Sequence, residues 1–125
     1  MDEEQTDTGT LETWTVEEVA AALEKGEIAL IDVRTVPEYM LERIPGALLV
    51  PMNELDPARL PSGEGKPLVF HCGSGKRSET VAKKLLGAGH DTVRHMGGGF
   101  GAWKTAGRAH IATDMASGAP VKKDG

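Results

Sequence analysis

Hydrophobic and polar positions follow two different periods along the middle of this chain. In residues 16–25 the apolar positions Val19, Ala20 and Leu23 recur at the spacing of one helix face, whereas residues 28–33 form a short apolar run typical of a buried strand. The same two patterns alternate as far as residue 106. Strands that alternate with helices predict an α/β domain with a mostly parallel sheet.

The boundaries of the predicted elements carry suitable start and stop residues. Thr15 followed by Glu18 forms a capping box for the first helix, and Gly26 stands where a helix commonly ends. Pro37 is suited to the first turn of a second, short helix. With an edge strand near Trp14, the sheet would contain about five strands. The remaining helices are expected at 78–86 and 100–106, and the other strands at 28–33, 47–50, 67–71 and 92–96.

The two ends of the chain lack such patterns. Residues 1–10 are polar and acidic, and residues 108–125 are small, polar and weakly patterned. Segments of this composition bury too little apolar surface to order themselves. We therefore expect flexible tails at 1–10 and 108–125, with the folded domain at residues 11–107.

Charge and hydropathy argue against several classes of protein. The 125 residues include 14 Lys and Arg against 19 Asp and Glu, for a net charge of −5. An acidic chain with no visible basic face is not expected to bind nucleic acid, because that binding depends on clustered cations. The longest apolar runs, such as residues 19–23, are far shorter than the ~20 residues that span a membrane. The acidic first residues are unlike a secretion signal, so we expect a cytoplasmic protein without membrane partners.

Cys72 is the only cysteine of the chain. A single thiol excludes an internal disulfide, a CxxC redox pair and a four-cysteine zinc site within this chain, and neither a metal nor another cofactor is expected. Glycine, by contrast, is abundant, and nine of the 16 glycines lie between Gly73 and Gly107. The abundance of glycine predicts that the backbone in this part of the chain adopts positive φ angles or approaches other groups closely.

The candidate chemistry lies in the segment HCGSGKRS, which follows the predicted strand at 67–71. Ligands of parallel sheets bind outside the carboxyl ends of strands. Gly73 and Gly75 allow successive N–H groups to turn inward around an anion, and the next helix adds the partial positive charge of its N-terminus. In such a loop the pKa of Cys72 should fall below the free value of about 8.5, which makes this residue the candidate nucleophile.

The side chains of this segment also have simpler interpretations. A lone cysteine after an apolar run is commonly a packing residue, but the glycines, cations and helix start beside it favour a reactive thiol. Lys76 and Arg77 would either contact an anionic substrate or remain solvated. Ser78 is expected to cap the helix, and His71 to point into the packing of the sheet.

Three motifs in order resemble those of the rhodanese-like sulfurtransferases in their single-domain form. They are LIDVRTVPEYMLERIPGA at 30–47, HCGSGKRS at 71–78 and GGGFGAW at 97–103, within a resemblance that spans about residues 12–107. The resemblance implies a three-layer α/β/α domain with a five-stranded, mostly parallel sheet flanked by helices. The backbone of the glycines at 97–99 is expected to pack under the loop that carries Cys72.

The resemblance also implies a double-displacement transfer of sulfur. Cys72 would take a sulfane sulfur from a small anionic donor such as thiosulfate, hold it as a persulfide, and pass it to a thiol, cyanide or protein acceptor. Backbone N–H groups of the following loop would surround the persulfide. The implied substrate-binding positions are Gly73, Ser74, Gly75, Lys76, Arg77 and Ser78.

Four charged residues are expected to support this loop rather than to react. The resemblance gives Asp32, Arg34 and Glu38 a structural task, and an acid, a base and an acid near one strand end most simply form ion pairs that fix loops. Arg43 is placed in the same group. The pair Glu42-Arg43 stands where the family usually has Gly-His, so a permanent cation replaces the usual histidine.

Two alternatives remain open from the sequence. A cysteine phosphatase or arsenate reductase also holds a thiolate in an anion-binding loop that ends in Arg. Here only the four residues from Gly73 to Lys76 separate Cys from Arg, one fewer than in the phosphatase loop, and a second cysteine that could resolve an intermediate is absent. The other alternative is a regulatory rhodanese-like module that carries persulfide without turnover. The number of turnovers with thiosulfate and cyanide separates this carrier from an enzyme.

Overall fold

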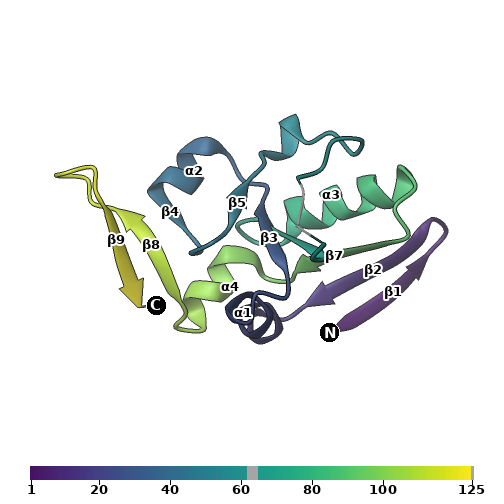
Figure 1. Ribbon diagram of the computed structural model, residues 1–125, viewed down its shortest axis with the longest axis horizontal. Helices are drawn as coiled ribbons and strands as arrows, with labels where there is room; N and C mark the ends of the chain where they lie inside the picture. The colour runs from purple at the N-terminus through teal and green to yellow at the C-terminus, as the bar shows by residue number, and fades with distance from the viewer. Residues whose placement is uncertain (62–64, 125) are drawn as a thin grey trace.

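The computed structural model describes residues 1–61 and 65–124. Within them a six-stranded sheet has the order β1-β2-β7-β6-β3-β5 (Figure 1). Neighbouring strands from β2 to β5 are parallel, and β1 runs antiparallel to β2. The expected parallel sheet is confirmed, including its strand near Trp14, and β1 extends it. The strands are β1 (Asp2–Thr6), β2 (Gly9–Trp14), β7 (Thr92–Met96), β6 (Leu68–His71), β3 (Ala29–Asp32) and β5 (Leu48–Leu49).

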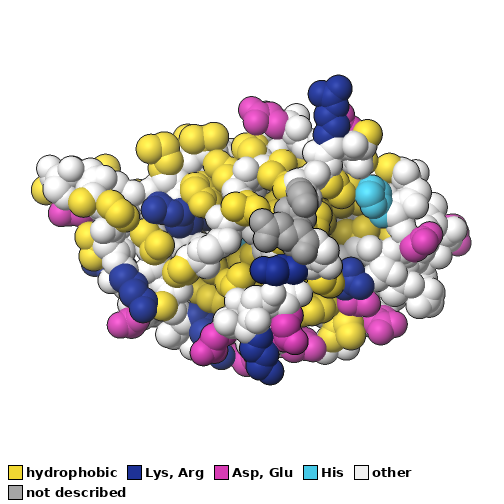
Figure 2. All heavy atoms as spheres, viewed as in Figure 1, with side chains coloured by type: hydrophobic (Ala, Val, Ile, Leu, Met, Phe, Trp, Pro, Cys, Tyr) yellow, Lys and Arg dark blue, Asp and Glu magenta, His cyan; other side chains and the backbone are white. Residues whose placement is uncertain are grey.

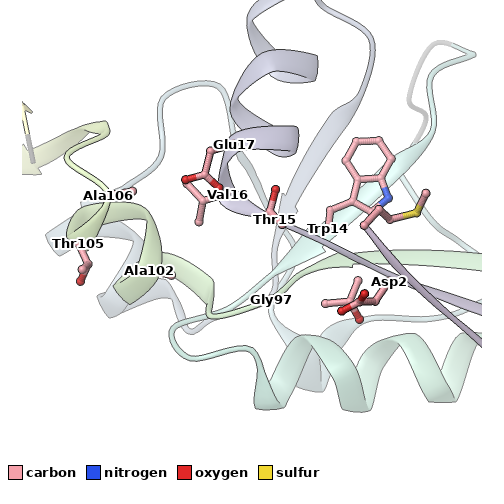
Figure 3. A pocket seen from close by; sticks show the side chains of 11 residues that line it. Asp2, Trp14, Thr15, Val16, Glu17, Gly97, Ala102, Thr105 and Ala106 are labelled. Atoms are coloured by element: carbon pink, nitrogen blue, oxygen red, sulfur yellow. The ribbon is translucent and has the colours of Figure 1, made fainter.

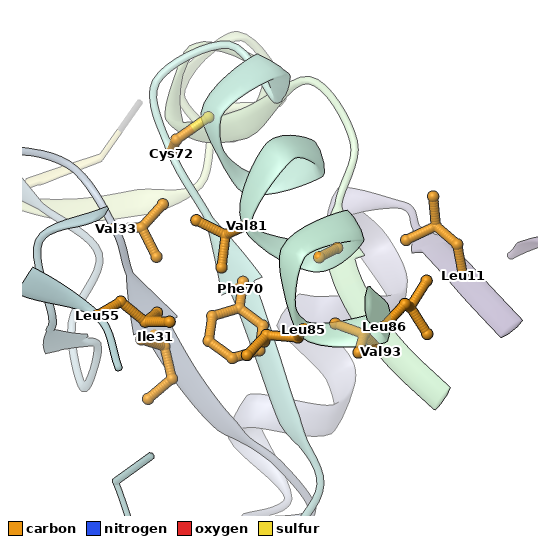
Figure 4. Close-up of a cluster of buried hydrophobic side chains, with 11 residues drawn as sticks. Leu11, Ile31, Val33, Leu55, Phe70, Cys72, Val81, Leu85, Leu86 and Val93 are labelled. Atoms are coloured by element: carbon orange, nitrogen blue, oxygen red, sulfur yellow. The ribbon is translucent and has the colours of Figure 1, made fainter. Parts of the chain in front are cut away.

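Helices cover both faces of this sheet. Successive residues of β3 point to opposite sides, so Leu30 packs with α1 and α4 and Ile31 packs with α3 (Figure 4). This is the period-two alternation of a sheet that is buried on both faces. The three-layer arrangement expected from the sequence is therefore present. The helices are α1 (Val16–Glu24), α2 (Val36–Leu41), the 3₁₀ turn η1 (Met52–Glu54), α3 (Lys76–Gly87) and α4 (Gly99–Thr105).

Both ends of the chain, which the sequence predicts as flexible tails, contain strands. At the N-terminus β1 pairs with β2 along its whole length. Near the C-terminus β8 (Ala109–Thr113) and β9 (Pro120–Asp124) form a hairpin that joins β4 (Glu42–Arg43) in a second sheet, which Figure 1 shows at the left. Most residues of β1 and all of β9 are exposed. Backbone hydrogen bonds pair such strands without an apolar face, so hydrophobic periodicity does not reveal them.

Capping boxes begin the first two helices. Thr15 accepts a hydrogen bond from the Glu18 N–H, and the Glu18 carboxylate accepts one from the Thr15 N–H, at 3.1 and 2.9 Å. Thr35 and Glu38 repeat the arrangement at the start of α2, at 3.4 and 3.1 Å. The capping box predicted at Thr15 is confirmed. The second one fixes Glu38 at the end of α2 that faces the loop of residues 72–77, the candidate reactive loop.

The helix α2 lies on the surface of the protein. None of its residues is buried, and Val36, Met40 and Leu41 leave about half of their surface or more exposed. Figure 2 shows apolar side chains gathered on this face, over the region of α2. In residues 1–61 and 65–124, no helix combines the length and hydropathy needed to cross a membrane, and no three His, Cys, Asp or Glu side chains group as metal ligands would.

Candidate active site

Cys72 is the first residue after β6, which lies between β3 and β7 in the sheet. The backbone then turns through Gly73 and Ser74 to Gly75, the last residue before α3. Gly75 has a φ of 102°, a left-handed conformation that favours glycine. Figure 4 shows the Cys72 side chain at the end of the hydrophobic cluster nearest the start of α3. The loop therefore occupies the carboxyl end of a central parallel strand, where such sheets bind ligands.

The Cys72 thiol is fully buried and is surrounded by hydrogen-bond donors. Its Sγ accepts hydrogen bonds from the N–H groups of Gly75 at 3.0 Å and Ser78 at 3.4 Å, and Ser78 Oγ lies 3.7 Å away. Burial raises the pKa of the thiol, but hydrogen bonds from Ser78, Gly75 and Ser74 outweigh it and lower the pKa below its ordinary value. The loop is arranged to hold a sulfur anion.

Ser78 does not cap α3, contrary to the sequence prediction. The helix begins two residues earlier, at Lys76, and Gly75 is its N-cap residue. Ser78 therefore lies within the first turn, where its buried side chain points inward. Its Oγ donates to the Gly75 carbonyl oxygen at 3.2 Å and lies 3.0 Å from His95 Nδ1. The left-handed turn at Gly75 makes the earlier start possible, because it brings the chain into the helix without a side-chain cap.

Arg77 is tied to α2 rather than directed into open solvent. Its two terminal nitrogens donate to the two carboxylate oxygens of Glu38, at 2.7 and 3.0 Å. These hydrogen bonds hold the pKa of Glu38 at about 2, and a hydrogen bond from Thr35 contributes to the lowering. Glu38 therefore links the reactive loop to the capped start of α2. Lys76 and Ser74 are exposed on the same loop.

A buried ion pair supports the strand ends beneath the loop. The Asp32 carboxylate accepts hydrogen bonds from the Arg34 backbone N–H and guanidinium at 2.9–3.1 Å, and Arg34 Nη2 also donates to the Glu42 carbonyl oxygen. His71 is buried beside this pair, with Nδ1 3.2 Å from the Cys72 carbonyl oxygen and Nε2 3.6 Å from Asp32. Burial lowers the pKa of His71, so its ring is neutral. These contacts fix the backbone from which the thiol projects.

The unusual Glu42-Arg43 pair serves the junction with the second sheet. The Glu42 carboxylate contacts Lys104 Nζ of α4 at 2.9 Å and His110 Nε2 of β8 at 3.2 Å. The Arg43 guanidinium lies 5.4 Å from the centre of the Tyr39 ring. The structural contribution of Glu42 and His110 is missed by sequence reasoning, because their contacts join segments that are far apart in the chain.

The glycine-rich segment before α4 packs directly under the reactive loop. The Phe100 N–H donates to the Cys72 carbonyl oxygen at 2.8 Å, and the Gly101 N–H donates to that of Gly73 at 3.0 Å. A Cβ atom on Gly99 would lie only 2.5 Å from the Cys72 carbonyl oxygen. The predicted close packing of this segment is confirmed, and at Gly99 the approach to Cys72 leaves no room for a side chain.

His95 is a second residue of the site that sequence reasoning misses. It lies on β7, is 3% exposed, and contacts Ser78 Oγ through Nδ1 and Thr13 Oγ1 through Nε2. The sequence signal that could have indicated its burial is its position between Val93 and Met96, two buried residues of a predicted strand. Buried histidines need partners for both ring nitrogens, but the partners come from other elements.

A cavity of about 490 Å³ lies apart from the thiol, between the end of β2, the start of α1 and α4 (Figure 3). Its lining includes Trp14, Val16, Gly97 and Ala102, and Cys72 is not part of it. Cys72 and the donors around it belong to the compact loop instead. The loop is therefore the candidate reaction site.

Known proteins resemble this chain in sequence and in fold. Residues 15–106 match the family described as rhodanese-like domain. The chain is 38% identical over 89 residues to an uncharacterized protein of Synechocystis, covering 71% of this chain and 50% of that protein. It is 32% identical over 107 residues to thiosulfate sulfurtransferase GlpE of Coxiella burnetii, covering 86% of this chain and 91% of that protein. Among solved structures, thiosulfate sulfurtransferase from Pseudomonas aeruginosa matches with a TM-score of 0.65 and 29% identity, covering 78% of this chain and 19% of that one.

Proposed function

Because this chain belongs to the rhodanese-like domain family, we propose that it is a sulfurtransferase whose Cys72 carries the transferred sulfur as a persulfide. Relatives named as sulfurtransferases support a role of this type. The observation that carries the proposal is the 3.0 Å hydrogen bond from the Gly75 N–H to Cys72 Sγ, which the Ser78 N–H supplements. Preorganised donors around one sulfur stabilise its anion without reorganisation during the reaction.

In the first half of the proposed reaction, the Cys72 thiolate attacks the outer sulfur of thiosulfate. A bond forms between Sγ and that sulfur, the S–S bond of thiosulfate breaks, and sulfite leaves with the bonding electron pair. The product is a Cys72 persulfide anion. The sulfur moves formally as a neutral atom, so the step needs no external oxidant or reductant.

In the second half, a thiolate or cyanide attacks the outer sulfur of the persulfide. The new bond to the acceptor forms as the S–S bond of the persulfide breaks, and Cys72 leaves as the thiolate with which the cycle began. One cysteine is sufficient for both halves, which agrees with the single cysteine of the chain. A thiol that must stay reduced between cycles suits a cytoplasmic setting.

The anionic donor is proposed to bind at the N-terminal end of α3. This helix has 12 residues, and the N–H groups of its first turn and of the preceding loop provide the positive end of the helix dipole. Lys76 adds an exposed cation at the first helical position. Arg77 adds a second charge whose position is fixed by Glu38. The remaining proposed contacts are the backbone groups of Gly73, Ser74, Gly75 and Ser78.

Intact-mass measurement of the whole chain tests this proposal. Thiosulfate should add the mass of one sulfur atom to the wild-type protein and none to Cys72→Ser or Cys72→Ala, with one sulfite released for each sulfur gained. Cyanide should then remove the added mass and form thiocyanate. Absence of any gain with thiosulfate, mercaptopyruvate and a cysteine-derived persulfide would falsify catalysis through Cys72. A gain that persists in Cys72→Ser would place the sulfur on another group.

A persulfide carrier is the second candidate, and the burial of Cys72 favours it. The side chain has no exposed surface, so small donors and acceptors alike reach its sulfur only after the loop opens, which slows repeated turnover. A carrier would take up one sulfur for each chain and release it slowly to cyanide, whereas an enzyme would form many thiocyanate ions for each chain. Counting turnovers under excess thiosulfate and cyanide decides between the two.

A further inference from the structure

Four polar side chains form a continuous line that begins at the Cys72 thiol. Ser78 Oγ lies 3.7 Å from Cys72 Sγ, and His95 Nδ1 lies 3.0 Å from Ser78 Oγ. Thr13 Oγ1 lies 3.1 Å from His95 Nε2, and the two residues are direct neighbours in the register of β2 and β7. Cys72 and Ser78 are fully buried, and His95 nearly so. The line therefore crosses from β2 through β7 and α3 to the end of β6 inside the protein.

The Ser78 hydroxyl has one proton and three neighbours that compete for it. Besides Cys72 Sγ and His95 Nδ1, the Gly75 carbonyl oxygen lies 3.2 Å from Ser78 Oγ. If His95 Nδ1 carries no proton, it accepts the Ser78 proton, and Ser78 then offers only a lone pair to the thiol. If Nδ1 carries a proton, it donates to Ser78 Oγ, and the Ser78 proton is left to the Gly75 carbonyl oxygen or to the sulfur. An ionised sulfur then attracts this proton more strongly than a neutral carbonyl oxygen does. The tautomer of His95 therefore decides what Ser78 can stabilise.

We propose that His95 is a positioning residue for Cys72, whose Nδ1–H donates to Ser78 Oγ and so directs the Ser78 hydroxyl proton toward the Cys72 sulfur. Ser78 then joins the N–H groups of Gly75 and Ser78 as a third donor to the thiolate. This inference rests on the proposed function for its catalytic meaning, although the contacts themselves involve only the free thiol. His95 is buried behind Ser78 and acts on Cys72 through it.

The contact with Thr13 fits this tautomer. A threonine hydroxyl can donate to His95 Nε2, and a neutral ring that accepts at Nε2 carries its proton on Nδ1. Burial lowers the pKa of His95, which favours the neutral ring with one proton to place. The charged groups that act on this ring are Glu79, which raises its pKa, and Lys83, which lowers it, both on α3.

A pH titration of thiolate absorbance tests the proposal, because Cys72 is the only cysteine and the whole signal comes from it. His95→Leu should move the midpoint of thiolate formation to higher pH. Below the wild-type midpoint, the thiolate population should fall about tenfold to a hundredfold, as the loss of one hydrogen bond to a charged group predicts. Ser78→Ala should shift the midpoint in the same direction.

The double variant separates an effect through Ser78 from an independent one. His95→Leu combined with Ser78→Ala should shift the midpoint no further than Ser78→Ala alone. Additive shifts, or a wild-type midpoint in a folded His95→Leu protein, would overturn the role of His95. His110→Leu is the matched control, because it removes another buried histidine from the junction with the second sheet. An equal shift in this control would show a general loss of packing and would also overturn the proposal.

Two conservative variants keep the proposal testable where His95→Leu does not fold. His95→Asn places an amide N–H near the position of Nδ1, whereas His95→Gln extends its amide toward Thr13. The midpoint of His95→Asn should therefore lie closer to the wild type than that of His95→Gln. Equal midpoints for the two amides would contradict the proposal.

The titration needs no sulfur donor, so its result is independent of sulfur transfer. A protein that shows the predicted shifts but accepts no sulfur contradicts the proposed function alone. A protein that transfers sulfur normally while its midpoints stay unchanged in the His95 variants contradicts the role of His95 alone.

Discussion

Glu38 of α2 and Arg77 of α3 form a two-point ion pair across 39 positions of the sequence, with nitrogen–oxygen distances of 2.7 and 3.0 Å. The pair has the parallel geometry in which a guanidinium and a carboxylate also orient each other. Since no residue of α2 is buried, this ion pair and the capping box at Thr35 are contacts that keep the helix beside the reactive loop.

Glu38→Gln should lower the free energy of unfolding at pH 7 by about 0.5–1 kcal/mol, a small value because solvent screens both partly exposed side chains. The Arg77 hydrogen bonds lower the pKa of Glu38 from 4.5 to about 2. A lowered folded-state pKa gives stability that is present above about pH 4.5 and is lost as the pH falls toward 2. Urea unfolding at pH 7 and near pH 2 should therefore show a difference that disappears in acid.

The control for this prediction is Glu79→Gln, which removes an ion pair with Lys83 inside α3. It should cost at most about 0.5 kcal/mol and leave α2 in place. A Glu38→Gln effect that is the same at both pH values would show that the charge of Glu38 does not contribute.

Gly99→Ala should destabilise the protein by about 2 kcal/mol or more and slow sulfur uptake by Cys72. Its φ is +60°, and an added Cβ would lie 2.5 Å from the Cys72 carbonyl oxygen, so the backbone under the loop must shift. Gly87→Ala is the matched control, because nothing lies within 4 Å of a Cβ there and the residue is helical. Thermal unfolding should show the control unchanged or stabilised by about 0.5–1 kcal/mol. Equal effects of the two substitutions would contradict the proposed contact.

Lys76→Ala should raise the apparent KM for thiosulfate about twofold to fivefold at low salt, with a smaller effect at high salt because ions screen an exposed charge. Arg77→Ala should raise the KM as well and should also release α2, since it removes the partner of Glu38. Lys84→Ala is the control. It lies about 12 Å farther along α3, so Lys84→Ala should raise the KM less than Lys76→Ala at low salt and leave it unchanged at physiological salt, where the Debye length is about 8 Å. A KM that is unchanged in Lys76→Ala would assign this lysine to the solvated surface.

Asp32→Ala should destabilise the protein by about 3–5 kcal/mol, because it leaves the buried Arg34 guanidinium without its carboxylate. The effect should exceed that of Glu38→Gln several-fold, since the Asp32–Arg34 pair is shielded from water. Urea unfolding at pH 7 measures both. The double variant Asp32→Leu with Arg34→Met should recover part of the loss, because no unpaired charge then remains. If the double variant recovers no stability, the Asp32–Arg34 pair stabilises the protein through its hydrogen bonds or packing rather than through charge balance.

The sequence predicts those features of the site that depend on neighbouring residues, and misses those that depend on contacts between distant segments. The strand before Cys72 and the glycines after it are contiguous, so their order alone indicates a turn into a helix beside a thiol. Ser78 was expected to cap that helix, and the prediction is wrong because the left-handed Gly75 starts the helix earlier and turns the Ser78 hydroxyl inward. The strands at both ends were missed because backbone pairing, rather than an apolar face, holds them.

The sequence by itself determined the fold class and the place of Cys72, since the alternation of apolar runs and amphipathic segments is a property of neighbouring residues. Only the tertiary structure decided which ion pairs and hydrogen bonds the charged and polar side chains form. Arg77 meets Glu38, Ser78 meets His95, and Gly99 lies under Cys72 because the sheet brings together segments that are far apart in the chain. No local pattern records these distances. The donors that hold the sulfur anion come from the loop, but the contacts that hold the loop come from the rest of the fold.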